Sequence, residues 1–260
     1  MTNSLHKLFD LTGRIALITG GSRGLGLQIA EALGEYGATV ILAARKQNEL
    51  DEAIQHLKGL GITADAVAAD LGRTQAAPVL ADTVLQRHGH VDILINNAGT
   101  SWGAPAEDYP LEGWTKVMDL NVTNLFVLTQ AIAKRSFIPR GGGAVVNLAS
   151  IEGLSGHHPR MIGTIAYNTA KGAVVNMTRA LAAEWGPKRI RVNAIAPGFF
   201  PSKLTKVIIE RHEAQMIEHT PSGRLGGEDD LKGAALLLAS DAGSHITGQI
   251  LVVDGGWSVI

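Results

Sequence analysis

The sequence of 260 residues lacks cysteine, so disulfide bonds, thiolate metal sites and cysteine nucleophiles are all excluded. It also lacks an excess of charge: the formal net charge is −1, which provides no basic surface for nucleic acid or anionic lipid. Long apolar runs are missing as well. Residues 1–10 do not form the hydrophobic stretch of a signal peptide, and no segment approaches the length of a membrane span. These absences predict a cytoplasmic protein that contacts neither nucleic acid nor membranes.

The sequence does contain enough apolar material for one large core. Hydrophobic residues make up 45% of the chain, and its length fits one α/β domain over residues 1–260 better than two small ones. Short β-rich runs alternate with longer helical patterns, and runs such as 15–18 are continuously apolar, as expected of strands covered on both faces. Repeated units of this kind predict a single-domain Rossmann-type fold, a doubly wound parallel sheet of about seven strands with helices on both faces.

The expected elements follow from these runs and from the turn residues between them. One long irregular insert remains, residues 198–227 with a short helical pattern over 204–218, and we expect it to act as a lid or binding loop. The expected strands are 14–19, 39–44, 64–69, 91–96, 144–149, 191–195 and 249–253. The expected helices are 24–36, 47–59, 75–88, 111–136, 166–185 and 228–239.

A glycine-rich loop follows the first expected strand and opens the first expected helix. Its glycines, spaced Gly20-x-x-x-Gly24-x-Gly26, allow the backbone to turn sharply and to approach a pyrophosphate group. The N-terminus of the helix adds amide donors and the positive end of the helix dipole. A turn that serves packing alone is the alternative interpretation. We expect cofactor contacts from Gly20, Ser22, Arg23, Gly24, Leu25 and Gly26.

The end of the second expected strand indicates which dinucleotide fits. Enzymes that use NAD usually carry an acidic residue about 20 residues after the glycine loop, where it binds the 2′-hydroxyl of the ribose. Here the strand ends at Arg45, and no acidic residue occurs between Glu35 and Glu49. The guanidinium groups of Arg23 and Arg45 are suited to bracket a 2′-phosphate instead. The sequence therefore predicts NADP(H) as the cofactor, against the alternative that both arginines are solvated surface residues.

Tyr167 and Lys171 lie four residues apart in an expected helix, so their side chains share one face. A free phenol has a pKa of about 10 and transfers protons slowly at neutral pH. A nearby ammonium group favours the phenolate and lowers that pKa. The pair therefore predicts a tyrosine that works as an acid or a base.

Together with the glycine loop, this pair makes the sequence resemble the short-chain dehydrogenase/reductase family over nearly its whole length. Further segments are similar to the family's motifs in the same order along the chain. They are Asp70-Leu71, Asn96-Asn97-Ala98-Gly99, Asn121, Ser150, Pro197-Gly198, Ser202 and Val253-Asp254-Gly255-Gly256. The resemblance implies adenine contacts for Asp70 and Leu71, contacts along the cofactor for Asn97, Ala98 and Gly99, and contacts at its nicotinamide end for Tyr167, Lys171, Pro197, Gly198 and Ser202.

The resemblance also implies four catalytic residues. Ser150 would donate a hydrogen bond to the carbonyl oxygen of the substrate, and Tyr167 would protonate that oxygen. Lys171 would lower the pKa of Tyr167 and hold the ribose of the nicotinamide. Asn121 would hold a water molecule that links Lys171 to solvent. The simpler alternatives are a strand-end cap for Ser150 and an ordinary helix cap or core hydrogen bond for Asn121.

Seventeen positions separate Ser150 from Tyr167, which is more than is common in the family. We therefore expect an enlarged loop over 152–164 that forms one wall of the substrate pocket. Glu152 in this loop is a candidate for recognising a polar substrate, with a solvated loop acid as the alternative. The pair His157-His158 has no acidic or cysteine partner at ligand spacing, so no metal site is expected.

Apolar side chains suggest two further features. Trp102, Phe199 and Phe200 follow family motifs and are candidates for an apolar pocket wall, with plain packing as the alternative. Helices like those expected at 111–136 and 166–185 often form subunit contacts in the family. The resemblance therefore implies a homo-oligomer, a dimer or a tetramer.

These features predict an enzyme, an NADP-dependent carbonyl reductase that converts a ketone to a secondary alcohol and back. Resemblance to 3-oxoacyl-[acyl-carrier-protein] reductases implies a 3-oxoacyl thioester or a related small carbonyl as substrate, with Lys203, Lys206 and Arg211 available for a carrier partner. Resemblance to gluconate 5-dehydrogenases implies a keto sugar acid instead. A third possibility is a sensor or scaffold that binds NADP without turnover. Such family members usually lose the tyrosine or the lysine, and this sequence retains both.

Overall fold

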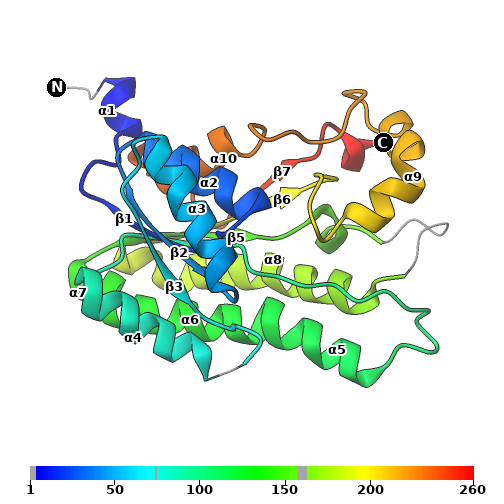
Figure 1. The fold of residues 1–260 in the computed structure, drawn as a ribbon, viewed down its shortest axis with the longest axis horizontal. Coiled ribbons are helices and arrows are strands. Elements are labelled where there is room, and N and C mark those ends of the chain that lie inside the picture. Colours follow the sequence, from blue (N-terminus) through cyan, green and yellow to red (C-terminus); the bar gives the residue numbers. More distant parts are fainter. Residues whose placement is uncertain (1–3, 74, 157–162) are drawn as a thin grey trace.

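Seven parallel strands form one sheet at the centre of the computed structural model, which describes residues 4–73, 75–156 and 163–260. Their order across the sheet is β3-β2-β1-β4-β5-β6-β7 (Figure 1), and every neighbouring pair is parallel. The predicted sheet is confirmed. The strands are β1 (Ile15–Thr19), β2 (Thr39–Ala44), β3 (Ala64–Ala68), β4 (Ile93–Asn96), β5 (Gly143–Leu148), β6 (Ile190–Pro197) and β7 (Ile250–Val253).

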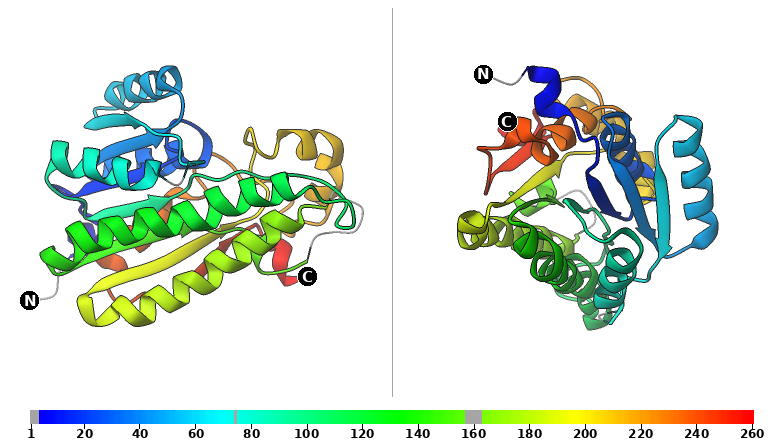
Figure 2. Two further views of the ribbon diagram at one scale, coloured as in Figure 1. Left: turned by 90° about the horizontal axis from the view of Figure 1, so that it is seen from below. Right: turned by 90° about the vertical axis from the view of Figure 1, so that its left-hand side faces the viewer.

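Helices cover both faces of the sheet, as predicted. On one face lie α2, α3 and α10, and on the other lie α4, α6 and α8 (Figure 1, Figure 2). None of the helices formed by the described residues combines the length and the apolar character that a membrane span requires. The helices are α1 (Leu5–Phe9), α2 (Gly24–Glu35), α3 (Gln47–Gly59), α4 (Ala76–His88), α5 (Leu111–Met118), α6 (Asn124–Ile132), α7 (Ile138–Arg140), α8 (Ile165–Trp185), α9 (Lys206–Glu218) and α10 (Lys232–Ala239), with π-helical turns η1 (Asp119–Thr123) and η2 (Ala133–Phe137).

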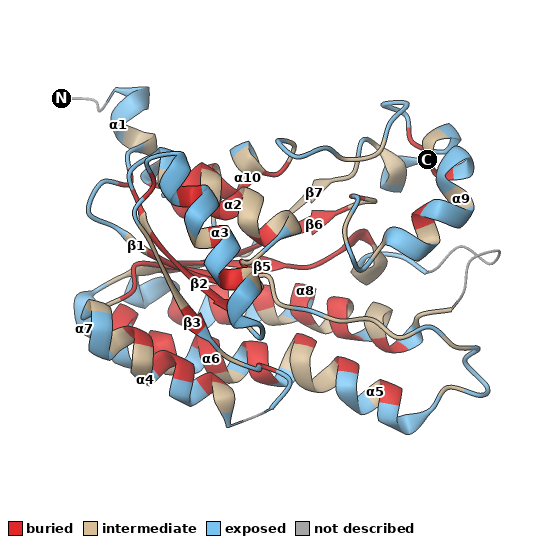
Figure 3. Cartoon of the chain, viewed as in Figure 1, coloured by how far each residue is buried: buried red, intermediate tan, exposed pale blue. Residues whose placement is uncertain are grey.

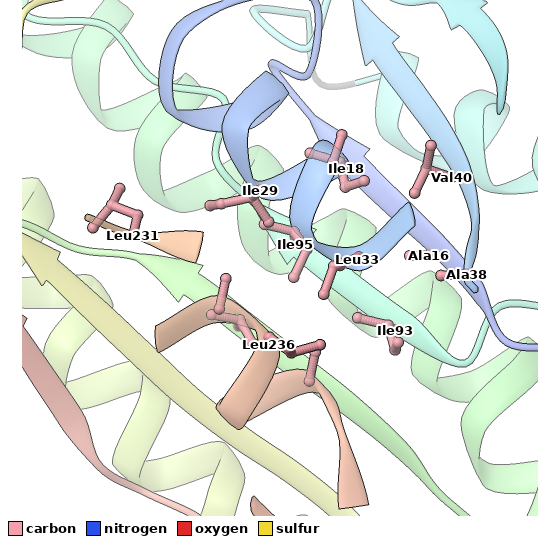
Figure 4. Packing of buried hydrophobic residues seen from close by; sticks show 14 of the residues in the cluster. Ala16, Ile18, Ile29, Leu33, Ala38, Val40, Ile93, Ile95, Leu231 and Leu236 are labelled. Atoms are coloured by element: carbon pink, nitrogen blue, oxygen red, sulfur yellow. The ribbon is translucent and has the colours of Figure 1, made fainter. Parts of the chain in front are cut away.

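Successive residues of each central strand point to opposite faces, which explains the continuous apolar runs in the sequence. Leu17 of β1 packs with residues of α4, α6 and α8, whereas Ile18 packs with residues of α2, α3 and α10. Figure 4 shows the second of these cores, with Ile18 in one cluster with Ile29, Leu33 and Leu236. Buried positions therefore run through the central strands of the sheet and along the inner sides of the helices (Figure 3).

The chain changes direction across the sheet between β1 and β4. From β1 it proceeds through β2 to β3 at one edge, and it then returns to β4 on the other side of β1. In an open parallel sheet, ligands bind in the crevice outside the carboxyl ends of the strands at such a switch point. Thr19 ends β1 and lies opposite Asn96, which ends β4. The fold therefore places the glycine loop beside the segment that begins at Asn96.

Next to this crevice, a network of hydrogen-bonded polar side chains connects two strands to the helices on one face of the sheet. Asn96 Nδ2 donates to Thr129 Oγ1 of α6 (2.8 Å) and to Asn147 Oδ1 of β5 (2.9 Å). Asn147 Nδ2 in turn donates to Thr178 Oγ1 of α8 (3.0 Å). All four side chains are buried. A hydrogen-bonded network of this kind fixes the relative positions of the elements that carry it, here β4, β5, α6 and α8.

Two predicted helices differ from the structure. The stretch 111–136 is not one α-helix, because i→i+5 hydrogen bonds replace the α-helical pattern at η1 and η2. The predicted helix 228–239 begins only at Lys232. The Asp230 carboxylate accepts a hydrogen bond from the Gly227 amide (2.7 Å) and pairs with Arg224, and these contacts form a turn before the helix.

The strand boundaries differ from the prediction by at most two residues at either end. The largest extension is at β6, which reaches Pro197 instead of ending at Ile195. Pairing with β5 stops at Ile195, and Pro197 pairs only with Val253 of β7, so a missing N–H is tolerated there. The short helix α1 has no counterpart in the prediction.

Candidate active site

A cavity of about 680 Å³ lies at the carboxyl ends of the strands, where the switch point predicts a ligand site. Of the residues predicted to bind the cofactor or to act in catalysis, Gly26 and Asn121 do not line it. The others all do: Gly20, Ser22, Arg23, Gly24, Leu25, Arg45, Asp70, Leu71, Asn97, Ala98, Gly99, Ser150, Tyr167, Lys171, Pro197, Gly198 and Ser202.

Gly26 lies against Gly20 inside the glycine loop. A Cβ atom at position 26 would come within 2.3 Å of the Gly20 carbonyl oxygen, so only glycine allows this packing. Gly20 has a φ of +64°, a left-handed conformation that also favours glycine. The structure therefore gives Gly26 a packing role, and its contact with the cofactor stays a prediction.

Asn97 joins the glycine loop to the end of β4. Its Nδ2 donates to the carbonyl oxygens of Thr19 and Gly20, both at 3.0 Å. The hydroxyl of Thr19 accepts hydrogen bonds from the backbone amides of Asn97 and Ala98, also at 3.0 Å. Two walls of the cavity are therefore held together by side chains of both segments.

The start of α2 fits the phosphates of a dinucleotide. The helix begins at Gly24, and no side chain caps its first turn, so backbone N–H groups there remain as donors. A Cβ atom at Gly24 would meet no atom within 4 Å, so open space adjoins the backbone at this point. Donors facing open space at a helix N-terminus are the arrangement that an anionic group requires.

Charged side chains surround the end of the cavity formed by β2 and α3. Arg45 lines the cavity and makes no hydrogen bond or ion pair within the part of the chain that the structure describes. Arg23 Nη1 lies 2.7 Å from Glu49 Oε1, and Lys46 Nζ lies 3.1 Å from the same oxygen. Sequence reasoning treated Glu49 only as the end of an acid-free stretch. The first turn of α3 brings it to the cavity wall.

Ser150, Tyr167 and Lys171 lie together at the end of the cavity formed by β5 and α8. Ser150 lies two residues after the end of β5, and its side chain shares a hydrogen bond with that of Tyr167. Lys171 Nζ lies 5.5 Å from the centroid of the Tyr167 ring and donates to the carbonyl oxygen of Leu148 at 2.5 Å. Lys171 is only 4% exposed. The structure therefore assembles the serine, tyrosine and lysine that the sequence predicted as a group.

Asn121 lies in the π-helical turn η1 and is fully buried. Its Oδ1 accepts a hydrogen bond from the Thr100 amide and its Nδ2 donates to the Thr100 carbonyl oxygen, both at 2.9 Å. A Cβ atom at Gly99 would lie 3.4 Å from Asn121 Oδ1 and 3.8 Å from Lys171 Nζ. Asn121 therefore fixes the segment after β4 beside Lys171 and does not itself line the cavity.

Comparison with known proteins agrees with this geometry. Residues 20–258 match the family model described as enoyl-(acyl carrier protein) reductase. The crystal structure of a short-chain type dehydrogenase/reductase from Mycobacterium marinum matches with a TM-score of 0.94 and 35% identity, covering 99% of this chain and 100% of that one. The chain belongs to the short-chain dehydrogenase/reductase family.

Two further relatives indicate the range of reactions among similar short-chain dehydrogenases/reductases. The chain is 39% identical over 258 residues to a rhamnolipids biosynthesis 3-oxoacyl-[acyl-carrier-protein] reductase from Pseudomonas aeruginosa, covering 97% of this chain and 99% of that one. It is 32% identical, with a TM-score of 0.92, to a gluconate 5-dehydrogenase from Burkholderia cenocepacia solved with NADP and tartrate, covering 99% of this chain and 100% of that one.

Burial dominates the pKa values of the tyrosine and the lysine in this short-chain dehydrogenase/reductase. It raises the pKa of Tyr167 to about 12; the hydrogen bond with Ser150 acts in the opposite direction, and the Glu152 carboxylate adds to the rise. Burial also lowers the pKa of Lys171 to about 8. The predicted lowering of the Tyr167 pKa by Lys171 is not seen in this structure, because the partial burial of the phenol outweighs the effect of an ammonium group that donates to Leu148.

Hydrogen bonds hold Glu152 in place, so it is not a solvated loop acid. Asn168 Nδ2 donates to Glu152 Oε2 (2.6 Å) and to its carbonyl oxygen (3.0 Å), which holds the carboxylate near Tyr167. The part of the loop 152–164 that contains His157-His158 lies outside the described residues. Among the residues described, no group of three or more histidine, cysteine, aspartate or glutamate side chains is placed so that it could hold a metal ion.

Only one of the three candidate aromatic residues lines the cavity of this short-chain dehydrogenase/reductase. Phe200 does so and is 3% exposed. Trp102 instead packs over Gly113 of α5, where a Cβ atom would come within 2.8 Å of its ring. The Phe199 ring packs edge-on against Trp257 with centroids 4.8 Å apart. Plain packing therefore accounts for Trp102, whereas Phe199 also lines a smaller neighbouring cavity of about 200 Å³ together with Phe200.

Proposed function

We propose that the chain reduces a ketone to a secondary alcohol with NADPH, and that the reaction is reversible. The observation that carries this proposal is the shared cavity, which Ser150, Tyr167 and Lys171 line together with the glycine loop and Arg45. The relative solved with NADP supports the choice of cofactor. The start of α2 would hold the phosphates of NADPH, and Arg45 would hold its 2′-phosphate. When bound, NADPH supplies the hydride.

The residues of the chain manage the carbonyl oxygen and its proton. Ser150 would donate a hydrogen bond to this oxygen, which stabilises the negative charge that develops there. Tyr167 would then give it a proton; its raised pKa keeps the phenol protonated at neutral pH, the form that reduction needs. Lys171, charged below its pKa of about 8, would stabilise the phenolate of Tyr167 after the transfer and would then pass a proton to it. Asn121 would hold a water molecule that returns a proton to Lys171.

Two substrate classes fit this reaction. A 3-oxoacyl thioester is our first candidate, supported by the similarity to the Pseudomonas aeruginosa reductase and by Lys203, which lines the cavity and offers an ammonium group to a phosphate-bearing carrier arm. A keto sugar acid is the second, supported by the similarity to the gluconate 5-dehydrogenase and by the polar pair Glu152 and Asn168 near Tyr167. The insert 198–227, which contributes Gly198 and residues 200–205 to the cavity wall, would act as a lid over either substrate.

The test is NADPH oxidation in the presence of acetoacetyl-CoA, 5-ketogluconate and simple ketones, with NADH run in parallel. Turnover with acetoacetyl-CoA supports the thioester, and turnover with 5-ketogluconate alone supports the sugar acid. If the folded chain bound NADPH but did not oxidise it with any carbonyl of the panel, the proposed activity would be wrong. The chain would then be a protein that binds NADPH without turnover.

The cofactor choice predicts a strong effect at Arg45. We expect Arg45→Asp to lower kcat/KM for NADPH about 50-fold, because a charge-assisted hydrogen bond to the 2′-phosphate is replaced by a repulsive charge. The value for NADH should stay within about twofold, since NADH has no phosphate at this position. Lys58→Asp serves as the control, because it also replaces a cationic side chain by aspartate, at an exposed position in the last turn of α3. An unchanged ratio of the two cofactors in Arg45→Asp would contradict the assignment.

We also propose that the chain forms a dimer or a tetramer through the outer faces of α5, α6 and α8. Leu111 of α5 is 77% exposed, and Phe126 of α6 and Ile165 of α8 are also exposed, which favours association. Sedimentation velocity at micromolar concentration should show a species of two or four chains. A single monomeric boundary would refute this proposal.

A further inference from the structure

One carboxylate oxygen at the cavity pairs with two cationic side chains. Oε1 of Glu49 lies 2.7 Å from Arg23 Nη1 and 3.1 Å from Lys46 Nζ. These residues come from the glycine loop and from the start of α3, and all three line the cavity. The Glu49 side chain is 19% exposed, whereas those of Arg23 and Lys46 are 46% and 56% exposed. The anion is therefore the most shielded member of the cluster.

The same cations lie in the part of the cavity proposed for the 2′-phosphate. A phosphate oxygen favours the position that Glu49 Oε1 has, between a guanidinium and an ammonium group. Arg45 lies on this wall and has no partner among the described residues, so it is available to a phosphate. Arg23 and Lys46 are already paired. The phosphate must therefore compete with Glu49 for them.

We propose that Glu49 sets how strongly the chain discriminates between NADP(H) and NAD(H), because its carboxylate takes the place of a phosphate oxygen and opposes the 2′-phosphate. This inference rests on the proposed use of NADP(H). The phosphate carries up to two negative charges, so it meets like charge at Glu49 whether it displaces the carboxylate or binds beside it. NAD(H) has a hydroxyl group at this position and meets no such repulsion.

The charge of Glu49 is present at neutral pH. Its hydrogen bond with Lys46 and the nearby charge of Arg23 hold its pKa below the ordinary value, against the opposing effect of burial. Its place in the first turn of α3 also favours a negative charge. Glutamine has nearly the same shape without the charge, so Glu49→Gln separates the electrostatic effect from the packing of the side chain.

The experiment is calorimetric titration of 2′,5′-ADP and of 5′-AMP into the wild-type chain and into Glu49→Gln at one salt concentration. These probes differ only in the 2′-phosphate and require no turnover. We expect Glu49→Gln to bind 2′,5′-ADP about tenfold more tightly than the wild type, from the repulsion of close charges at a partly exposed site. The affinity for 5′-AMP should stay within about twofold. Equal or weaker binding of 2′,5′-ADP by a folded Glu49→Gln variant would overturn the proposal.

Asp51→Asn is the matched control, since Asp51 is an exposed carboxylate on the same helix that pairs with Gln47 at 2.8 Å and does not line the cavity. It should leave both affinities unchanged. An equal gain in Asp51→Asn would show a general effect of net charge and would refute a specific role of Glu49. Glu49→Ala provides a second variant and should give the same gain as Glu49→Gln.

The same titrations test the proposed use of NADP(H) separately from the role of Glu49. If the wild type bound 2′,5′-ADP and 5′-AMP equally while Glu49→Gln gained a preference for 2′,5′-ADP, the role of Glu49 would stand and the proposed use of NADP(H) would be wrong. If the wild type preferred 2′,5′-ADP and Glu49→Gln did not change that preference, the cofactor choice would stand and the role of Glu49 would be wrong.

Discussion

Tyr167→Phe is expected to lower kcat for ketone reduction about 10³-fold or more. The substitution removes only the hydroxyl group, which shares a hydrogen bond with Ser150 and is the proposed proton donor to the substrate. A partly buried phenol with a pKa of about 12 holds its proton at neutral pH, and no other phenol lines this cavity among the described residues. NADPH oxidation with the best carbonyl of the panel measures the effect.

The binding of 2′,5′-ADP should be unchanged in Tyr167→Phe, because Tyr167 lies at the other end of the cavity from Arg45. Tyr109→Phe is the matched control: its hydroxyl donates to the Trp102 carbonyl oxygen at 2.9 Å, and it does not line the cavity. Its kcat should stay within about twofold. Turnover near the wild-type level in Tyr167→Phe would contradict the proposed mechanism.

Lys171→Met is expected to lower kcat about 100-fold while making the folded chain more stable at pH 7. Burial lowers the pKa of Lys171 from 10.5 to about 8, so the charged lysine is unfavourable in the folded state. That shift corresponds to about 3 kcal/mol at pH 7. Loss of the hydrogen bond to Leu148 offsets about 1 kcal/mol of this. The free energy of unfolding should therefore rise by about 2 kcal/mol.

The sign of this effect gives it a distinct dependence on pH. Between pH 8 and 10.5 the unfolded chain binds more protons at Lys171 than the folded chain, so wild-type stability rises with pH in this window. The gain in the free energy of unfolding from Lys171→Met should have its full value below pH 8 and should decrease as the pH approaches 10.5. Urea unfolding at pH 7 and at pH 10 measures it, with the exposed Lys188→Met as control. A variant less stable than the wild type at pH 7 would contradict the account of the buried charge.

The sequence predicts the sheet well because its signals are local. Continuous apolar runs mark strands covered on both faces, and the glycine spacing marks a loop between a strand and a helix. Gly20 and Gly24 are recognisable for this reason, as are the helical neighbours Tyr167 and Lys171. Their meeting with Ser150 follows from the fold, since parallel strands end at the same edge of a sheet.

Other features of the site depend on contacts that no local pattern records. Glu49 was missed because the sequence signal for an acidic ribose contact is the end of the second strand, whereas Glu49 reaches the cavity from the next helix. The raised pKa of Tyr167 was not predicted because burial depends on neighbours from several elements. The packing role of Gly26 depends likewise on how the glycine loop folds onto Gly20.

The π-helical turn η1 makes chain length a determinant of the site. A π-helical turn closes its hydrogen bonds over one more residue than an α-helical turn. Deleting one residue within Asp119–Thr123 would restore ordinary helical bonding and would leave α5 and α6 largely in place, because the π-helical turn takes up one extra residue, but it would change the direction of the side chains within the turn. Asn121 would then no longer face Thr100. In this stretch the number of residues is as necessary as their identity, and the helix cannot be shortened by one residue, as a surface loop can, without moving the site.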